Sequence, residues 1–231
     1  MTRGTEPVST TPVRVPIGDR SLNGDLRIPP QSHGLVLFAH GSGSGRRSPR
    51  NQYVARALEH RDLATLLIDL LTPQEEAIDD RTAQYRFDLA MLARRLVTIV
   101  DWLGGRKDTA ALPIGLFGAS TGGGAALMAA ADRPHEIAAV VSRGGRPDLA
   151  GSSLARVTTP TLLIVGGLDM PVIQMNRDAM NEIGGEVALE IVPGATHLFE
   201  EPGTLERVAA LAGDWFAHHL HLHLTRSTPR G

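Results

Sequence analysis

The sequence has 231 residues, of which 42% are hydrophobic and 21% charged, and its formal net charge is −2. These values are typical of a globular protein that buries a substantial core, and they give no reason to expect a nucleic-acid partner. The chain has no cysteine, which excludes disulfides, thiolate zinc sites and a cysteine nucleophile. We expect a protein that uses neither a metal nor a cofactor.

The N-terminal residues lack the apolar segment of a secretory signal, and no run reaches the ~18 apolar residues of a membrane span. We therefore expect a cytoplasmic protein with no membrane partner. A chain of this length is commonly a single α/β domain, here over residues 1–231. Its polar ends, residues 1–10 and 225–231, are expected to be flexible.

Two short strands, 13–17 and 24–28, are separated by a polar turn and are typical of a hairpin. Beyond the hairpin, the pattern predicts buried strands that alternate with helices. The predicted strands are 34–39, 63–71, 114–117, 137–142, 161–165 and 187–192. The predicted helices begin at Pro49 with Ser48 as cap, run from about 80 to 103 after an acidic loop, cover 125–131, begin at Pro171, and run from about 204 to 220. This alternation predicts a mostly parallel eight-stranded sheet with helices on both faces.

A strand, a sharp turn and a helix are predicted in close succession over residues 112–130. At the turn lies Gly118-Ala119-Ser120-Thr121-Gly122, a G-x-S-x-G motif. In this context the motif places the serine at the apex of the turn, with its hydroxyl at the N-terminus of a helix. The same five-residue pattern also occurs in ordinary turns. Further residues must therefore decide whether Ser120 is a nucleophile.

Two residues supply the groups that a serine nucleophile needs. Asp169 follows the strand 161–165 and His197 follows the strand 187–192, so the chain order is Ser, Asp, His. A histidine base removes the serine proton, and a carboxylate orients the histidine. Asp169 could instead cap the helix that begins at Pro171, and Glu200 is the alternative carboxylate. The combination nevertheless predicts a catalytic triad of Ser120, Asp169 and His197.

An acyl-transfer site also needs donors for the oxyanion. The backbone N–H of Thr121, directly after the nucleophile, is one candidate. The loop after the strand 34–39 supplies the other, and we favour the N–H of Ser42 because Gly41 and Gly43 allow close approach of the backbone. A nucleotide-binding loop is the competing interpretation, but HGSGSGRRS matches neither glycine-rich phosphate motif.

Arginines follow two of the strands that are predicted to end beside Ser120. They are Arg46, Arg47, Arg50, Arg143 and Arg146. Guanidinium groups bind carboxylate or phosphate well, so we predict an anionic group on the substrate, with Arg47 and Arg143 as its contacts. The alternative is that the arginines are ordinary surface residues or pair with Asp69 and Asp148.

The segments HGSGS, GASTG, GGLD and PGATH together resemble the α/β-hydrolase superfamily, in its dienelactone-hydrolase-like branch, over about residues 12–221. The resemblance implies an α/β-hydrolase fold. Dienelactone hydrolases proper have a cysteine nucleophile where this chain has Ser120, which favours a general ester or thioester as substrate. HGSGSGRRSPRN, SRGGRPDLAG and PGATHLFEEPG are similar to hydrolase domains that are joined to phosphoribosyltransferases. That similarity implies association with such an enzyme.

We interpret the chain as a serine hydrolase that cleaves small carboxylic esters through an acyl-enzyme intermediate. About 17 residues separate Ser142 from Pro160, too few for a large cap domain. A thioesterase, an amidase, a lactone hydrolase or a cofactor-free peroxidase on the same site remain alternatives. A ligand-binding or partner domain that keeps the triad without turnover is an alternative of another class. A homodimer is left open.

Overall fold

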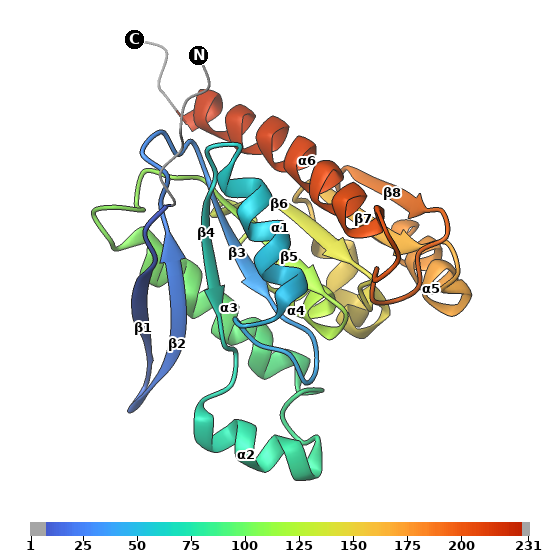
Figure 1. Cartoon of the computed structure of the whole chain (residues 1–231), viewed down its shortest axis with the longest axis horizontal. Helices are drawn as coiled ribbons and strands as arrows, with labels where there is room; N and C mark the ends of the chain where they lie inside the picture. The colour runs from blue at the N-terminus through green and yellow to red at the C-terminus, as the bar shows by residue number, and fades with distance from the viewer. Residues whose placement is uncertain (1–7, 228–231) are drawn as a thin grey trace.

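The computed structural model of the chain describes residues 8–227. Figure 1 shows a single twisted sheet with helices on both of its faces. The described strands follow the order β1-β2-β4-β3-β5-β6-β7-β8 across the sheet. The pairs β1–β2 and β2–β4 are antiparallel and the other five pairs are parallel. The predicted fold class, a mostly parallel eight-stranded α/β sheet, is confirmed.

The strands are β1 (Thr11–Ile17), β2 (Arg20–Arg27), β3 (Leu35–Ala39), β4 (Ala64–Ile68), β5 (Ile114–Ala119), β6 (Ile137–Arg143), β7 (Thr161–Gly166) and β8 (Val187–Val192). The helices are α1 (Pro49–Glu59), α2 (Pro73–Thr82), α3 (Leu89–Gly104), α4 (Thr121–Asp132), the 3₁₀ helix η1 (Pro147–Arg156), α5 (Met170–Met180) and α6 (Thr204–Ser227).

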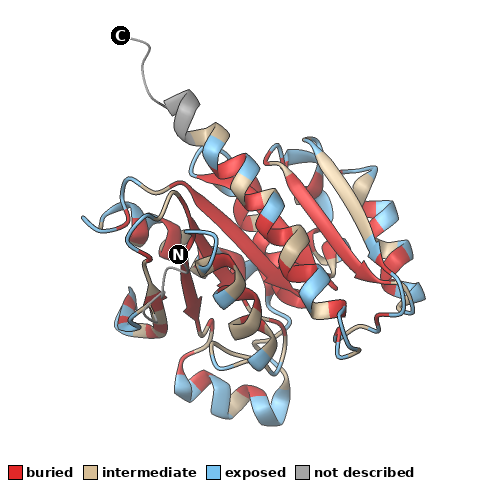
Figure 2. Ribbon diagram, turned by 45° about the horizontal axis from the view of Figure 1, so that its top comes forward, coloured by how far each residue is buried: buried red, intermediate tan, exposed pale blue. Residues whose placement is uncertain are grey.

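The core lies on both faces of the sheet. Every residue of β3, β4, β5, β6 and β7 is buried, as Figure 2 shows. One apolar cluster joins the sheet to α3 and α4, with Leu96 and Leu127 among its members. The other joins it to α1 and α6, with Leu58 and Phe216 among its members. Strands covered on both faces carry continuous apolar runs, which is why the sequence pattern revealed them.

The predicted long helix over 80–103 is wrong, and so is the acidic loop before it. The structure has two helices there, α2 and α3, with residues 83–88 between them. Asp79 ends α2 because its carboxylate accepts the backbone N–H groups of Tyr85 and Arg86 at 2.7 and 2.9 Å. Ala83 there adopts a left-handed conformation with φ of 54°. Local side chain–backbone bonds thus outweigh the helical pattern.

The remaining expectations concern the ends of the chain and the cap. Residues 225–227, expected to be flexible, belong to α6, while 1–7 and 228–231 lie outside the described residues. Between β6 and β7 the chain forms only η1, so no large cap domain is present there. Among the helices described, none is both long and apolar enough to span a bilayer.

Candidate active site

The Gly118–Gly122 motif forms the sharp turn that the sequence predicts. Ser120 lies between β5 and α4 with φ of 52° and ψ of −124°, an unfavourable conformation for a residue with a side chain. The flanking glycines permit the turn because a Cβ atom at Gly118 would lie 2.5 Å from the Cα of Gly123. A Cβ at Gly122 would lie 2.2 Å from the carbonyl oxygen of Ala39. Only glycine therefore fits at positions 118 and 122.

The second and third triad candidates are in direct contact. Asp169 follows β7, and its Oδ2 lies 2.6 Å from Nδ1 of His197, in the loop after β8. Asp169 makes no side-chain cap bond to α5, so the capping alternative is not what the structure shows. The alternative carboxylate, Glu200, instead pairs with Arg50 at 2.9 Å. This geometry fixes the proton on Nδ1 and leaves Nε2 as the basic nitrogen.

Ser120 and His197 both contact the segment that follows β6. The Ser120 carbonyl accepts the N–H of Arg146 at 3.1 Å, and the Ser120 N–H donates to the Arg143 carbonyl at 3.3 Å. A Cβ atom on Gly144 would lie 3.6 Å from Nδ1 of His197. Within residues 8–227 no hydrogen bond joins the Ser120 hydroxyl to His197. The acid–base pair is therefore formed, whereas the contact between base and nucleophile stays a prediction.

The loop after β3 packs directly on the turn at Ser120. A Cβ atom on Gly41 would lie 3.0 Å from both the Ala119 carbonyl oxygen and the Cβ of Ser120. The Ser42 N–H donates to Oγ1 of Thr121 at 3.1 Å, and the two hydroxyl oxygens lie 3.0 Å apart. The two predicted oxyanion residues thus lie side by side. To bind an oxyanion, the Ser42 N–H would have to exchange its hydrogen bond to the Thr121 hydroxyl for one to the oxyanion.

His40 is a supporting residue whose role the sequence did not reveal. Its Nε2 accepts the backbone N–H of Leu70 at 2.8 Å, and its Nδ1 lies 3.0 Å from the Gly41 carbonyl oxygen. Because Nε2 accepts, Nδ1 carries the proton. Burial lowers the pKa of His40, so the ring stays neutral at neutral pH. His40 ties the loop after β3 to the loop after β4 and so holds Ser42 in place.

The arginines near the site separate into paired and unpaired groups. Arg46 pairs with Asp69 and with Asp25, and Arg146 pairs with Asp148 at 2.7 Å. For these two the alternative of pairing is confirmed. Arg50 pairs with Glu200 at 2.9 Å, so of these five arginines, all within residues 8–227, the two without a carboxylate partner are Arg47, which is exposed, and Arg143, which is buried.

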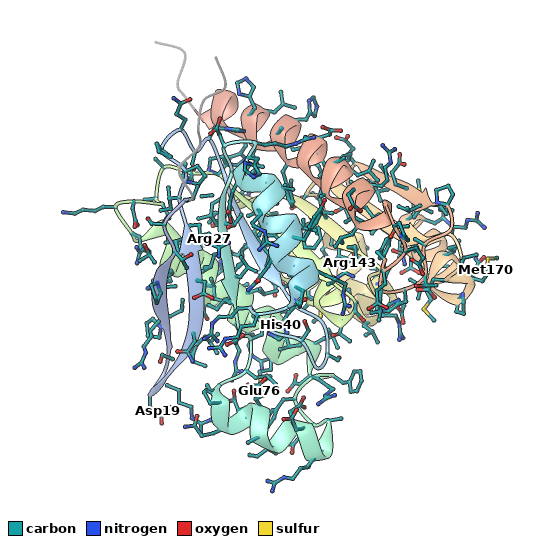
Figure 3. All side chains as sticks on the ribbon, in the orientation of Figure 1. Asp19, Arg27, His40, Glu76, Arg143 and Met170 are labelled. Atoms are coloured by element: carbon teal, nitrogen blue, oxygen red, sulfur yellow. The ribbon has the colours of Figure 1, made fainter. Side chains whose placement is uncertain are left out.

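Arg143 is almost completely buried, and no carboxylate within residues 8–227 pairs with it. Its side chain comes from the end of β6, where Figure 3 labels it, and the residue is 6% exposed. One Nη atom lies 3.5 Å from Oδ1 of Asn51, the guanidinium lies 5.7 Å from the centre of the Phe199 ring, and Nε has no acceptor. Burial lowers the pKa of Arg143 to about 10, and the charge of Arg50 adds to the effect. The group stays protonated at neutral pH.

A pocket opens beside Ser42 and Thr121, between the loop after β3 and α2 (Figure 3, where His40 and Glu76 mark its two sides). Ser42 and Thr121 line one side of it, and Glu76, Asp79 and Arg86 line the other. In the part of the chain that the structure describes, no three His, Asp or Glu side chains are placed to hold a metal ion.

The sequence matches an alpha/beta hydrolase domain model over residues 32–210. The chain belongs to the α/β-hydrolase family. A dienelactone hydrolase of Anabaena variabilis is 59% identical, with a TM-score of 0.91, over 92% of this chain and 99% of that one. This likeness places the chain in the dienelactone-hydrolase-like branch.

More distant solved structures share the fold. Est1E of Butyrivibrio proteoclasticus is 17% identical with a TM-score of 0.76, over 91% of this chain and 99% of that one. A dienelactone hydrolase-like promiscuous phosphotriesterase from metagenomic libraries is 17% identical with a TM-score of 0.73, over 92% and 98% of the two chains.

Two proteins of Mycobacterium tuberculosis provisionally named phosphoribosyl transferases are each 56% identical to this chain over 214 residues. The match covers 93% of this chain and 47% of each relative. The chain thus spans about half the length of these relatives.

Proposed function

We propose that this hydrolase cleaves small carboxylic esters, with Ser120 as nucleophile, His197 as general base and then acid, and Asp169 as the residue that orients His197. The observation that carries the proposal is the 2.6 Å contact between Asp169 and His197. His197 lies beside Gly144, and Ser120, with φ of 52°, is hydrogen-bonded to Arg143 and Arg146 of the same segment. The family likeness supports the reaction class. Thioesters and lactones present the same acyl carbonyl and remain alternatives.

In the proposed mechanism Nε2 of His197 takes the proton of Ser120 as Oγ attacks the acyl carbon. The N–H groups of Thr121 and Ser42 then hold the oxyanion, and the Ser42 N–H changes partner from the Thr121 hydroxyl. His197 gives its proton to the leaving alcohol. Water, deprotonated by His197, releases the acid and restores Ser120. Losing one oxyanion donor costs ~10²–10³ in rate.

We also propose that the preferred ester carries an anionic group, with Arg143 and Arg47 contributing to its attraction. Support comes from the buried Arg143, which lacks a carboxylate partner, and from the exposure of Arg47 at the same edge of the sheet. A buried cation without a counter-ion is unfavourable unless another group compensates it.

The decisive experiment measures hydrolysis of short-chain aryl esters by the wild-type protein and Ser120→Ala, with the exposed Ser152→Ala as matched control. We expect Ser120→Ala to lower kcat by about 10⁴-fold or more and to abolish labelling by a fluorophosphonate probe. Equal activity in the two variants would remove the proposal, and no labelling of wild type would favour a non-catalytic binding domain. Parallel assays with thioesters, amides and lactones separate the alternatives.

We further propose association with a phosphoribosyltransferase, because the relatives that carry that name are about twice the length of the matching region. The test is co-elution in size-exclusion chromatography with the remaining half of a Mycobacterium tuberculosis relative, expressed separately. Light scattering in the same run reports whether the chain alone forms the homodimer left open by the sequence. Separate elution at micromolar concentrations would contradict the association.

A further inference from the structure

A hollow opens at the edge of the sheet where the parallel strands begin. It lies between the end of α3, the loop that follows, the first residue of β5 and the C-terminal part of α6. The triad residues follow the carboxyl ends of their strands, so the hollow lies at the opposite edge from them. Its apolar lining consists of Val100, Ala110, Ala111, Leu112, Pro113 and Ile114.

The hollow combines buried apolar residues with exposed ones. Val100 and Ile114 are buried, whereas Ala110 is exposed. A Cβ atom on Gly104 would meet nothing within 4 Å, so the hollow is open beside the end of α3. Its polar lining includes Asp101, Glu136 and His223. Apolar residues with polar ones beside them are typical of a protein–protein interface.

Both ends of the described chain lie toward this edge of the sheet. β1 pairs antiparallel with β2, which pairs antiparallel with β4, so β1 begins toward the same edge as the parallel strands. Leu220 of α6 lies against the start of β3, since a Cβ atom on Gly34 would lie 2.6 Å from its Cδ1. Three residues later, His223 lines the hollow. Figure 1 shows the start of β1 and the end of α6 on the same side of the molecule.

The Mycobacterium tuberculosis relatives extend beyond the region that this chain matches. The match covers 93% of this chain but 47% of each relative, so each relative has a further half before or after it. In either position, that half is joined at the edge where β1 begins and α6 ends. It therefore starts next to the hollow and away from the triad. Such a connection gives an effective concentration of about 1 mM, so an interface of modest affinity suffices.

We infer that this hollow is the surface on which a phosphoribosyltransferase half docks, with apolar side chains of that half against the lining of the hollow. The inference rests on the proposed association and specifies its surface. Because the hollow and the triad lie at opposite edges of the sheet, docking leaves the ester site open to substrate.

Lys107 provides a direct probe of this surface. It is the only lysine in the sequence, it is exposed, and it lies between Gly104 and Thr109, which both line the hollow. The test uses a chimera in which this chain replaces the matching region of a Mycobacterium tuberculosis relative, so that the other half and its connection are kept. The measured quantity is the rate of Lys107 acetylation by an N-hydroxysuccinimide ester, followed by mass spectrometry, in the chimera and in this chain alone.

The blocking variant is Gly104→Arg. The open space beside Gly104 accommodates the new side chain within this chain, but the side chain then occupies the hollow. The exposed Ser152→Arg on η1 is the matched control, because Ser152 does not line the hollow. The ratio of the two rates is taken within each variant, which cancels any direct effect of the new charge on Lys107.

We expect Lys107 acetylation to be about 10-fold slower in the chimera than in this chain alone, given an effective concentration of about 1 mM and a dissociation constant of about 0.1 mM. Gly104→Arg should bring the ratio close to one, and Ser152→Arg should leave it unchanged. If the chimera does not fold, hydrogen exchange of the unmodified relative takes its place. Its segment aligned with residues 100–114 should then exchange more slowly than that segment of this chain.

Equal acetylation rates in the chimera and in this chain, or protection that persists in Gly104→Arg, would overturn the inference. Protection that appears in this chain alone as its concentration rises would assign the hollow to a second copy and would also overturn it. Co-elution of the separate halves without protection of Lys107 would leave the association standing and place its surface elsewhere. The association itself fails when the halves elute separately.

Discussion

Helices α4 and α2 both follow a strand end and both line the pocket beside Ser42, yet they are attached to the protein in opposite ways. In α4 ten of the twelve residues are buried, and small side chains allow its first turn to lie against the sheet. In α2 the buried residues are two carboxylates, Glu75 and Asp79. Figure 2 shows α2, at the bottom of the view, as largely exposed.

The attachment of α2 is therefore electrostatic. Glu75 binds Arg95 through two hydrogen bonds of 2.6 and 2.8 Å and forms a capping box with Thr72. Asp79 binds Arg86 at 2.6 Å. Apolar packing is insensitive to pH, whereas ion pairs depend on the charge of both partners. The proposed nucleophile thus lies on the tightly packed side of the site, whereas the attachment of α2 on the other side depends on pH.

Gly122→Ala tests the tightness of the α4 side and carries the largest expected effect. The new Cβ would lie 2.2 Å from the Ala39 carbonyl oxygen and 2.6 Å from that of His40, both backbone atoms. We expect the free energy of unfolding to fall by about 3 kcal/mol, measured by urea denaturation. Gly104→Ala, where a Cβ meets nothing within 4 Å, is the control and should cost nothing. Equal effects would show that α4 is not tightly packed.

Glu75→Gln tests the α2 side. Removing the charge leaves Arg95 without its carboxylate partner, so we expect the local opening free energy of α2 to fall by about 1–3 kcal/mol. Hydrogen exchange should be faster in residues 73–82 and unchanged in α4. Asp80→Asn, which loses an exposed contact of 3.8 Å to Arg86, should change neither helix. Faster exchange throughout the protein would mean that α2 is part of the global cooperative unit.

Acid should release α2 while α4 stays in place. Burial alone would raise the pKa of Glu75, but the bonds from Arg95 and Thr72 outweigh it and lower the pKa to about 2 from 4.5. Because the pKa is lowered in the folded state, the charged Glu75 stabilises the attachment of α2 fully above pH 4.5. This contribution is lost as the pH falls from about 4.5 to 2.

The absence of native cysteine makes the measurement direct, since a fluorophore can be placed at Gln74→Cys on α2 and, as control, at Arg177→Cys on α5. Anisotropy should fall over this pH range for the first label only. A parallel fall for both labels would indicate general unfolding instead.

The same contrast explains what could be predicted from the sequence. The strands and α4 could be predicted from continuous apolar runs, because segments buried in the centre of the fold consist almost entirely of apolar residues. Ser120, Asp169 and His197 were found because each follows a strand end, and strand ends in a parallel sheet share one edge. The contact of Ser120 with His197, and the oxyanion roles, stay predictions.

What the sequence did not reveal depends on long-range pairing. The sequence does not distinguish Arg47, Arg50 and Arg143. The fold shows that Arg47 is exposed, that Arg50 pairs with Glu200 and that Arg143 is buried. The break between α2 and α3 depends on the backbone hydrogen bonds that the Asp79 carboxylate accepts from Tyr85 and Arg86. Hydrophobic periodicity does not encode such bonds.

The buried amide of Asn176 on α5 has a consequence for redesign of the enzyme. Its Nδ2 donates both to the carbonyl of Gly145 and to that of Val172 in its own helix. The next N–H along, that of Arg146, holds the Ser120 carbonyl. Helix α5, which begins directly after Asp169, is therefore hydrogen-bonded to the Gly145 carbonyl, and the adjacent Arg146 N–H is hydrogen-bonded to the turn at Ser120. Grafting a foreign α5 would displace Ser120 and Asp169 together, whereas the exposed outer side of α2 is open to insertion.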